Sequence, residues 1–332
     1  MKNPTLRPAE ASDRAGILEL FQTVFGKERT ADEWDWLFQQ GPVGPADLII
    51  AVDGETIIAH AATIRRAAHV EGTASIFGQS VDAMTHPDWQ KRGLNQRLNE
   101  ALRPIHEAAG IEWVYGFSNE VSTRIVMERQ GRRSLGPFPL LARPLRGGIG
   151  AIARLGRSPE PPAPHPADIP NDIDALAEDA QRWHAVGVRR DHDHLSWRYR
   201  RPGGCYHAVS LREGEELVGF GVLAIRNQGP LRAAFVAEAL VGEDTPERWK
   251  RLTRALLERA RGLRCDVMVA LGCEGSRVRG AWTRAGLKGV PEWLQPERVA
   301  FSIRPAHAQT PATESVYDPS KWHLCWGEHD LV

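Results

Sequence analysis

A cluster of prolines divides the chain near its middle. Nine of the 23 prolines fall between Pro137 and Pro170, where they are mixed with glycines. Proline fixes φ and lacks an N–H, so this stretch cannot continue a regular helix or a central strand. The chain has 332 residues, and one hydrophobic core rarely grows past about 250 to 300 residues. The sequence therefore predicts two folded units joined by a proline-rich segment.

The proline cluster suggests four regions along the chain. We expect an N-terminal domain at 1–145, a Pro/Gly-rich linker at 146–170, a second domain at 171–305 and a tail at 306–332. The final segment, SKWHLCWGEHDLV, is unusually aromatic for a chain end. We therefore expect the tail to dock on the body of the protein.

The first half has the pattern of an α/β unit. Apolar residues recur at helical spacing over 11–25, and a second short helix opens at Thr30. The Asp53-Gly54 pair between two apolar runs predicts a hairpin, and SIFGQSVDAMT (75–85) predicts a further strand. An amphipathic helix from Leu94, a strand and a last helix complete the order α-α-β-β-β-α-β-α.

The second half repeats landmarks of the first in the same order. WLFQQGPVG (36–44) and WRYRRPGG (197–204) are each followed by a hairpin turn, at Gly54 and Gly214, which lie 18 and 17 residues after the tryptophan. Strand, helix, strand and helix patterns follow in both halves. Recurrence at nearly one spacing favours an internal duplication. The expected fold class is α/β (α+β), with two domains that each have a mixed sheet flanked by helices.

Composition excludes several classes of function. The 42 Lys and Arg balance 42 Asp and Glu, which disfavours binding to nucleic acid or to a membrane surface. Four cysteines at irregular spacing predict reduced thiols. The absence of an apolar leader or a span of about 20 apolar residues leads us to expect a cytoplasmic protein. We expect a monomer or a homodimer.

The strongest local signal is THPDWQKRGLNQRL, residues 85–98, between a strand and a helix. Gly93 permits close approach of a ligand to the backbone, and helix N-terminal amides favour anions. Lys91 and Arg92 add charge that suits a pyrophosphate. The simpler alternative is an ordinary strand-to-helix turn capped by Asp88.

The order of strand, His-Pro, Gln90-Lys91-Arg92-Gly93, helix, strand and then Asn119 opening a helix resembles the GCN5-related N-acetyltransferase (GNAT) superfamily. The family loop reads Q/R-x-x-G-x-G/A, and this sequence has Asn95 at the second small position. The resemblance covers about residues 4–135 well and about 172–304 at the level of the fold. It identifies the chain as a tandem-GNAT protein whose first copy carries the motif.

The resemblance implies acetyl-CoA or another acyl-CoA as co-substrate. The thioester carbonyl would be bound by a backbone N–H near the end of the strand that precedes the loop. The residues that the resemblance assigns to the co-substrate are Ala83, Met84, Thr85, Gln90, Lys91, Arg92, Gly93, Leu94, Asn95, Gln96, Asn119 and Ser122.

Acyl transfer to an amine also requires proton transfer. A protonated amine with a pKa near ~10 must lose a proton, so a base is needed. Asp82 is the first choice for the base, although a solvent-facing or turn-capping role for this acid is equally consistent; Glu120 and His86 are weaker candidates. Many family members have a tyrosine acid where this chain has Met127. Tyr115, or Tyr199 and Tyr206 from the second copy, could substitute, although a buried tyrosine more often has a packing role.

The second copy lacks the features of a coenzyme site. Its equivalent loop, GEDTPERWK (242–250), has no glycine after the strand and places Glu243, Asp244 and Glu247 at a helix start. With Thr245 as cap, these acids satisfy the helix dipole and would repel a pyrophosphate. We therefore expect the second copy to wall the acceptor pocket or to stabilise the first copy.

No metal site is expected. Asp191, His192, Asp193 and His194 are ligand types, but adjacent residues point in different directions and lack the spacing of helical zinc pairs. The segment instead predicts a helix cap before Trp197.

The expected function is an acyl-CoA-dependent N-acyltransferase, with acetyl transfer as the leading case, acting on the primary amine of a small molecule. One alternative keeps the fold but uses an acyl carrier protein or decarboxylates a thioester. A second alternative is a non-catalytic binding or scaffold protein.

Overall fold

The computed structural model describes residues 4–118, 127, 130–137, 139–146, 159–291, 293, 295, 300–310 and 313–329. The chain forms two compact units, and each is described by itself. Unit 1 consists of Met1–Ala68, Ala74–Gly136 and Val299–Thr313, and unit 2 of His69–Thr73, Pro137–Arg298 and Glu314–Val332.

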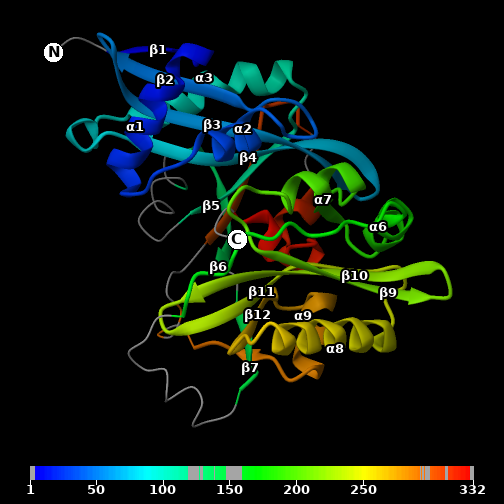
Figure 1. Cartoon of the computed structure of the whole chain (residues 1–332). Helices are drawn as coiled ribbons and strands as arrows, with labels where there is room; N and C mark the ends of the chain where they lie inside the picture. Colours follow the sequence, from blue (N-terminus) through cyan, green and yellow to red (C-terminus); the bar gives the residue numbers. More distant parts are fainter. Residues whose placement is uncertain are drawn as a thin grey trace. The chain divides into compact units, whose positions relative to one another are not determined.

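Unit 1 is built on one sheet (Figure 1). Its strands, in spatial order, are β1 (Thr5–Pro8), β2 (Asp47–Asp53), β3 (Thr56–Val70), β4 (Thr73–Thr85), β5 (Trp113–Ser118), β14 (Ala300–Pro305) and β6 (Arg133–Pro137). β4 and β5 run parallel, whereas β1–β2, β2–β3 and β5–β14 are antiparallel. The sheet is therefore mixed.

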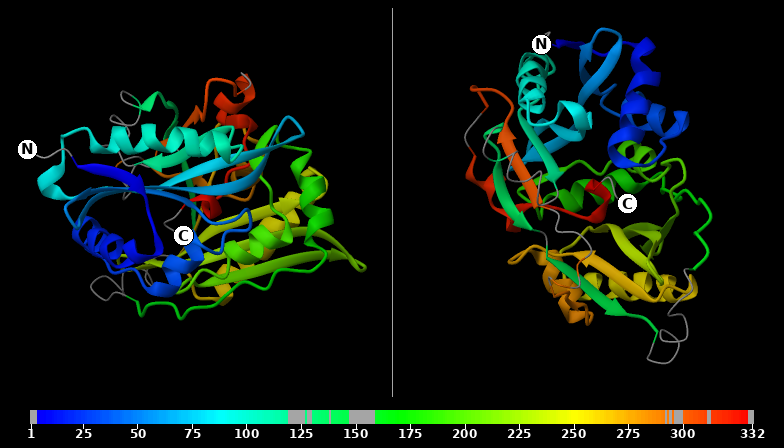
Figure 2. Two further views of the ribbon diagram at one scale, coloured as in Figure 1. Left: turned by 90° about the horizontal axis from the view of Figure 1, so that it is seen from above. Right: turned by 90° about the vertical axis from the view of Figure 1, so that its left-hand side faces the viewer.

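Helices cover both faces of this sheet. They are η1 (Ala11–Asp13), α1 (Arg14–Phe25), α2 (Ala31–Phe38), η2 (Pro87–Trp89) and α3 (Leu94–Ala108). Figure 2 shows α3 on one face and α1 on the other. Helix α2 begins with a capping box, in which Thr30 accepts from the Glu33 N–H at 3.1 Å. Leu94, Leu98 and Leu102 pack from α3 against β2 and β3.

Unit 2 has a second mixed sheet. Its strands, in spatial order, are β13 (Lys288–Gly289), β7 (Leu140–Pro144), β12 (Val267–Leu271), β11 (Leu231–Val241), β10 (Glu216–Gln228) and β9 (Tyr206–Glu213). In Figure 1, α8 (Pro246–Gly262) and α9 (Arg277–Arg284) lie on one face, and α6 (Ile173–Gln181) and α7 (His192–Arg198) on the other. Strand β8 (Val186–Val188) pairs with the end of β3, and η4 (Glu314–Tyr317), η5 (Pro319–Lys321) and η6 (Trp326–Glu328) follow late in the chain.

Each sheet contains a strand from the opposite half of the sequence. In unit 1, β14 lies between β5 and β6, with Ile303 opposite Tyr115. In unit 2, β7 lies between β12 and β13, with Ala142 opposite Val269. The two halves thus exchange one strand, so the units are not continuous stretches of chain. The sequence-based boundaries of independent domains stay a prediction.

Several local predictions are confirmed. The fold is mixed α/β with two helix-flanked sheets. The Asp53-Gly54 turn joins β2 to β3, and Thr245 caps α8. All four cysteines are free and buried.

Among the described helices, none has the length and hydropathy required to cross a bilayer.

Candidate functional site

The central feature of unit 1 is a split between β4 and β5. The parallel ladder pairs Phe77 with Trp113, Gly78 with Val114, and Gln79 with Tyr115. Beyond this pair, β4 continues to Thr85 and β5 continues to Ser118. Backbone groups on the facing edges of these extensions are not used in the ladder that joins the two strands. The split opens toward the carboxyl end of β4, which leads directly to α3.

The loop from β4 to α3 presents an open helix N-terminus. Lys91 and Gly93 have φ angles of 63° and 75°, in the left-handed region that turns the chain sharply. Gly93 is the N-cap of α3 and supplies no capping side chain, and the first turn of the helix has no acid. The first-turn N–H groups lack intrahelical acceptors and carry the positive end of the dipole. This end can therefore bind an anion.

The predicted loop residues differ in exposure. Ala83, Gln90, Lys91 and Arg92 are exposed, Thr85, Gly93, Asn95 and Gln96 are half-buried, and Met84 and Leu94 are buried. Arg92 lies over the Trp89 ring, 4.6 Å from its centroid, and donates to the Asp88 carbonyl at 2.9 Å. Met84 and Leu94 can therefore contribute only backbone groups to a ligand.

Asn95, the departure from the family loop, has a structural partner. Its Oδ1 accepts from Gln130 Nε2 at 2.6 Å and from Asn99 Nδ2 at 3.0 Å. The side chain is thus held by other side chains of unit 1. The backbone N–H of Asn95 stays at the start of α3.

Asp82 lies at a bend in β4. Its φ is 47°, a left-handed value within a strand. Its carboxylate forms an ion pair with Arg29, and the two side chains are 6% and 14% exposed respectively. The predicted base is therefore next to the loop but already paired, and its catalytic role stays a prediction.

His60, on β3, is a candidate that the sequence reasoning missed. Its Nδ1 lies 2.9 Å from the Asp82 carbonyl oxygen, and its buried Nε2 has no hydrogen-bond partner. Burial lowers the pKa of this imidazole. A single histidine in an apolar strand gives no sequence signal, because satisfied core histidines are more common.

Tyr115, the predicted acid, is 1% exposed and lies at the last β4–β5 pair. Its hydroxyl donates to Gln79 Oε1 at 3.4 Å, and that oxygen also accepts from Arg66 Nη2 at 2.6 Å. Its ring packs 5.7 Å from Phe301. Tyr115 is therefore at the apex of the split, in a packed polar network.

Some predicted residues lie outside the described part of the chain. Asn119, Glu120 and Ser122 are among them. Met127, where family members have a tyrosine, is described and 41% exposed.

The equivalent helix start in unit 2 is closed. Thr245 accepts from the Arg248 N–H at 3.3 Å, and Pro246 occupies the first turn of α8. Asp244 accepts from Trp249 Nε1 at 2.7 Å. The Thr245 cap and Pro246 in the first turn are as the sequence predicted, and the Thr245 hydroxyl takes one of the N–H groups that an anion would use.

The C-terminal tail packs along β11 in unit 2. The ladder between β11 and β12 ends at Phe235–Val269. At this last pair, Trp326 packs against Phe235 with ring centroids 5.1 Å apart. Arg190, on the chain between β8 and α7, forms ion pairs with Glu238 of β11 and Glu328 of the tail. The tail therefore packs where the β11–β12 ladder ends.

One group of potential metal ligands occurs within the described residues. Ligand atoms of Glu238, His323 and Cys325 lie within 4.8 Å of one another, and all three residues are buried. The Glu238 carboxylate is already paired with Arg190, at 3.4 Å from its Nε. Burial raises the pKa of the Cys325 thiol well above its usual value, so the thiol stays protonated. The group is explained as a polar network that holds the tail.

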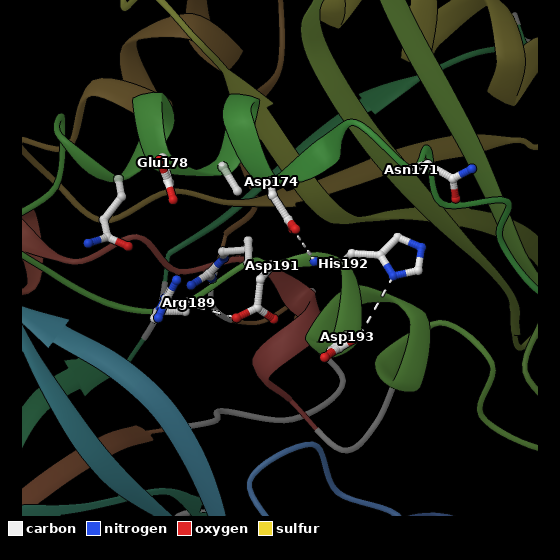
Figure 3. Close-up of a pocket in the computed structure, with 10 residues that line it drawn as sticks. Asn171, Asp174, Glu178, Arg189, Asp191, His192 and Asp193 are labelled. Carbon is white, nitrogen blue, oxygen red and sulfur yellow. Dashed lines mark hydrogen bonds and ion pairs between the residues drawn. The ribbon is translucent and has the colours of Figure 1, made fainter.

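A cavity of about 410 Å³ lies in unit 2 between α6 and the start of α7 (Figure 3). Part of its polar lining is internally paired: Asp174 accepts from the His192 N–H at 2.6 Å, and Arg189 lies 3.9 Å from Asp191. Asp191 caps α7 by accepting from the His194 N–H at 3.0 Å. The predicted helix cap is thus confirmed, and none of the loop residues 82–96 lines this cavity.

Comparisons with known proteins agree with this geometry. A family model of the acetyltransferase (GNAT) domain matches residues 5–125. The comparison with curated proteins gave no match.

Solved structures share the fold at low identity. A probable N-acyltransferase from Enterococcus faecalis aligns with a TM-score of 0.64 and 11% identity, covering 93% of this chain and 74% of that one. A GCN5-related N-acetyltransferase from Anabaena variabilis aligns with a TM-score of 0.63 and 9% identity, and the alignment covers 93% of this chain and 74% of that one. Saccharomyces cerevisiae N-myristoyltransferase, solved with myristoyl-CoA, aligns with a TM-score of 0.57 and 10% identity. This alignment covers 91% of this chain and 79% of that one.

Proposed function

Because a family model of the acetyltransferase (GNAT) domain matches residues 5–125, we propose that the protein is an acyl-CoA-dependent N-acyltransferase. The acceptor is the primary amine of a small molecule, and acetyl is the first acyl group to test. The observation that carries the proposal is the β4–β5 split beside the open N-terminus of α3. Together they offer strand backbone for the thioester arm and helix amides for the phosphates.

The co-substrate is held mainly by backbone. The N–H groups from Lys91 to Gln96 bind the pyrophosphate, and the Lys91 and Arg92 side chains add charge-assisted contacts. A backbone N–H between Ala83 and Thr85 stabilises the oxyanion that develops on the thioester carbonyl. The left-handed bend at Asp82 supports this role, because it breaks the regular direction of β4 just before these residues.

Proton transfer is proposed to use Asp82. The protonated amine first gives a proton to the Asp82 carboxylate, directly or through water, and the free amine nitrogen then attacks the carbonyl carbon. The tetrahedral intermediate expels the thiolate of coenzyme A, and the second proton lost by the nitrogen converts this thiolate to the thiol. A thiol with a pKa near ~8.5 leaves without strong acid assistance, although Tyr115 is the proposed donor if one acts. Glu120 stays a weaker candidate for proton transfer.

Unit 2 is proposed to lack a coenzyme site of its own. The capped start of α8 and the docked tail support this inference, because Thr245 and Pro246 fill the helix start and Trp326 of the tail packs against β11. Unit 2 then serves to shape the acceptor site or to support unit 1, as a second, degenerate copy of the fold.

The test is release of free thiol from acetyl-CoA across a panel of amino sugars, amino acids and polyamines. We expect acceptor-dependent release, and mass spectrometry should find the acylated amine. Binding of acetyl-CoA without turnover on any amine would favour the scaffold alternative. No binding would contradict the proposed function.

A further inference from the structure

Several buried residues of unit 1 carry polar atoms that have no hydrogen-bond partner, and four of these residues form one group apart from His60. The unpartnered atoms of this group are Arg132 Nε, Arg304 Nε and Nη2, Ser302 Oγ and His106 Nδ1. None of the four residues is more than 6% exposed. Unsatisfied buried polar groups are costly and uncommon, so several together require an explanation.

Strand register places three of these residues on one face of the sheet. Ser302 lies opposite Gly116, and Arg304 lies opposite Val114. Residues two apart on a strand point to the same side, so Ser302 and Arg304 share a face. Arg132 Nη1 lies 2.9 Å from the point where a Cβ on Gly116 would be. Glycine at this position therefore makes room for the guanidinium beside Ser302.

His106 reaches this region from α3. Its Nε2 lies 3.0 Å from Thr63 Oγ1, which leaves Nδ1 for another partner. Burial, followed by the charges of Arg304 and Arg132, lowers the pKa of His106 to about 3. The imidazole is therefore neutral at physiological pH, and it is close enough to both guanidinium groups for their charges to lower its pKa.

The two arginines lack a balancing negative charge. Among the described residues, no carboxylate forms an ion pair with either one, and Arg304 donates only through Nη1, to the carbonyls of Pro305 and Ala306 at 2.9 and 3.3 Å. Burial lowers the pKa of Arg132 to about 9 and that of Arg304 to about 10. Both side chains are still cationic at neutral pH. Buried charges in proteins are normally paired, so an anion is the missing component.

The free edge of Arg304 indicates which anion fits. Nε–H and Nη2–H are parallel donors on one side of the guanidinium and match the two oxygens of a carboxylate. These are the two nitrogens of Arg304 that have no partner. A planar, two-oxygen acceptor would satisfy both at once.

We propose that Arg132 and Arg304 form a buried anion site in unit 1 that takes a carboxylate. Ser302 Oγ and His106 Nδ1 supply further polar contacts to it. The carboxylate is either a free small molecule or the terminal group of an acyl chain. The second source rests on the proposed function, in which the thioester arm lies in the split between β4 and β5. Tyr115 is in the last β4–β5 pair and Gly116 follows it, so the Arg132 guanidinium beside Gly116 lies where the split begins.

The first arm of the test is thermal unfolding with acetate. Sodium acetate replaces the sodium salt of a bulky sulfonate at constant ionic strength and pH 7.5. Wild-type Tm should rise saturably, by roughly 5 °C at a hundredfold excess over Kd. Arg132→Met should lose the rise and match or exceed wild type without acetate. Arg133→Met removes the same charge from an exposed neighbour and should behave as wild type.

The second arm compares succinyl-CoA with acetyl-CoA by calorimetry. If the acyl chain supplies the carboxylate, wild type should bind succinyl-CoA at least about tenfold more tightly, and Arg132→Met should remove the preference. Equal binding together with a saturable acetate effect identifies a free carboxylate. If neither thioester binds but acetate stabilises, the proposed function fails and the anion site stands.

The anion site is contradicted by an equal acetate effect in wild type and Arg132→Met, or by no acetate effect and no succinyl preference. If Arg132→Met does not fold, a measurement on the wild-type protein alone still tests the anion site. The 19F resonance of trifluoroacetate should broaden on adding protein and sharpen again on adding acetate. An unchanged line at millimolar protein contradicts the proposal.

Discussion

The guanidinium of Arg29 binds both carboxylate oxygens of Asp82, although 53 residues separate the two in sequence. Arg29 also lies over the Phe21 ring, 4.0 Å from its centroid, which fixes the guanidinium from the other side. Asp82 is therefore held in one orientation beside the β4 bend. When the Asp82 carboxylate accepts a proton, it does so while still in contact with the positively charged Arg29 guanidinium.

Asp82→Asn is expected to lower kcat by about 100-fold at pH 7, in the usual range for loss of a general base. The Kd of acetyl-CoA should change less than twofold, because Asp82 is assigned no contact with the coenzyme. The deficit should shrink toward pH 10, where the amine loses its proton unaided. Asp88→Asn, whose side chain is 85% exposed, is the control. A parallel pH profile in mutant and wild type would remove Asp82 from the role of base.

Arg92→Glu is expected to raise the Kd of acetyl-CoA by at least about tenfold, since it replaces a charge-assisted phosphate contact with repulsion. The effect should decrease at high salt because Arg92 is exposed. Lys27→Glu makes the same charge change at another exposed site and should leave Kd unchanged. Calorimetry at two salt concentrations measures both. Equal losses in the two variants would indicate a general charge effect.

Glu328→Gln is expected to destabilise unit 2 by about 3 kcal/mol, because it removes a partner from the buried Arg190. Glu243→Gln breaks an ion pair with Arg248 in which the Glu243 side chain is 65% exposed. That change should cost less than about 0.5 kcal/mol. Urea unfolding followed by tryptophan fluorescence measures both variants, and Trp326 reports on the tail. Equal stability of the two variants would contradict the assigned role of the tail network.

His106 should make stability sensitive to acid. Its folded pKa is about 3, below the usual 6.5, so the unfolded chain binds more protons between these values. The stabilisation is therefore complete above pH 6.5 and is lost as pH falls toward 3. His106→Gln should reduce the slope of unfolding free energy between pH 6 and 4 by about 1.4 kcal/mol per pH unit. An unchanged slope would mean that His106 can be protonated in the folded protein.

Local structure could be predicted from the sequence where the residues that determine it lie within one short segment. The Thr30 capping box, the Asp53-Gly54 turn and the Asp191 cap each depend on residues within three or four positions. The positive φ at Gly93 is likewise a local preference of glycine. The loop and the open helix start could therefore be predicted.

Long-range pairings could not be predicted in the same way. Short strands such as β7 and β14, of five and six residues, have apolar patterns that fit either sheet, so their exchange is decided by tertiary packing. The Arg29–Asp82 contact and the group around Arg132 depend on strands far apart in sequence. The sequence showed Asp82 near the loop but not the partner that holds it.

The central claim is that one unit of this protein binds an acyl-CoA and the other does not. Calorimetric titration of the whole chain with acetyl-CoA tests it most directly. The open α3 start of unit 1 and the capped α8 start of unit 2 predict one site per chain, weakened at least about tenfold by Arg92→Glu. The claim would be contradicted if acetyl-CoA did not bind. It would also be contradicted if each chain bound two molecules of acetyl-CoA and Arg92→Glu weakened neither site.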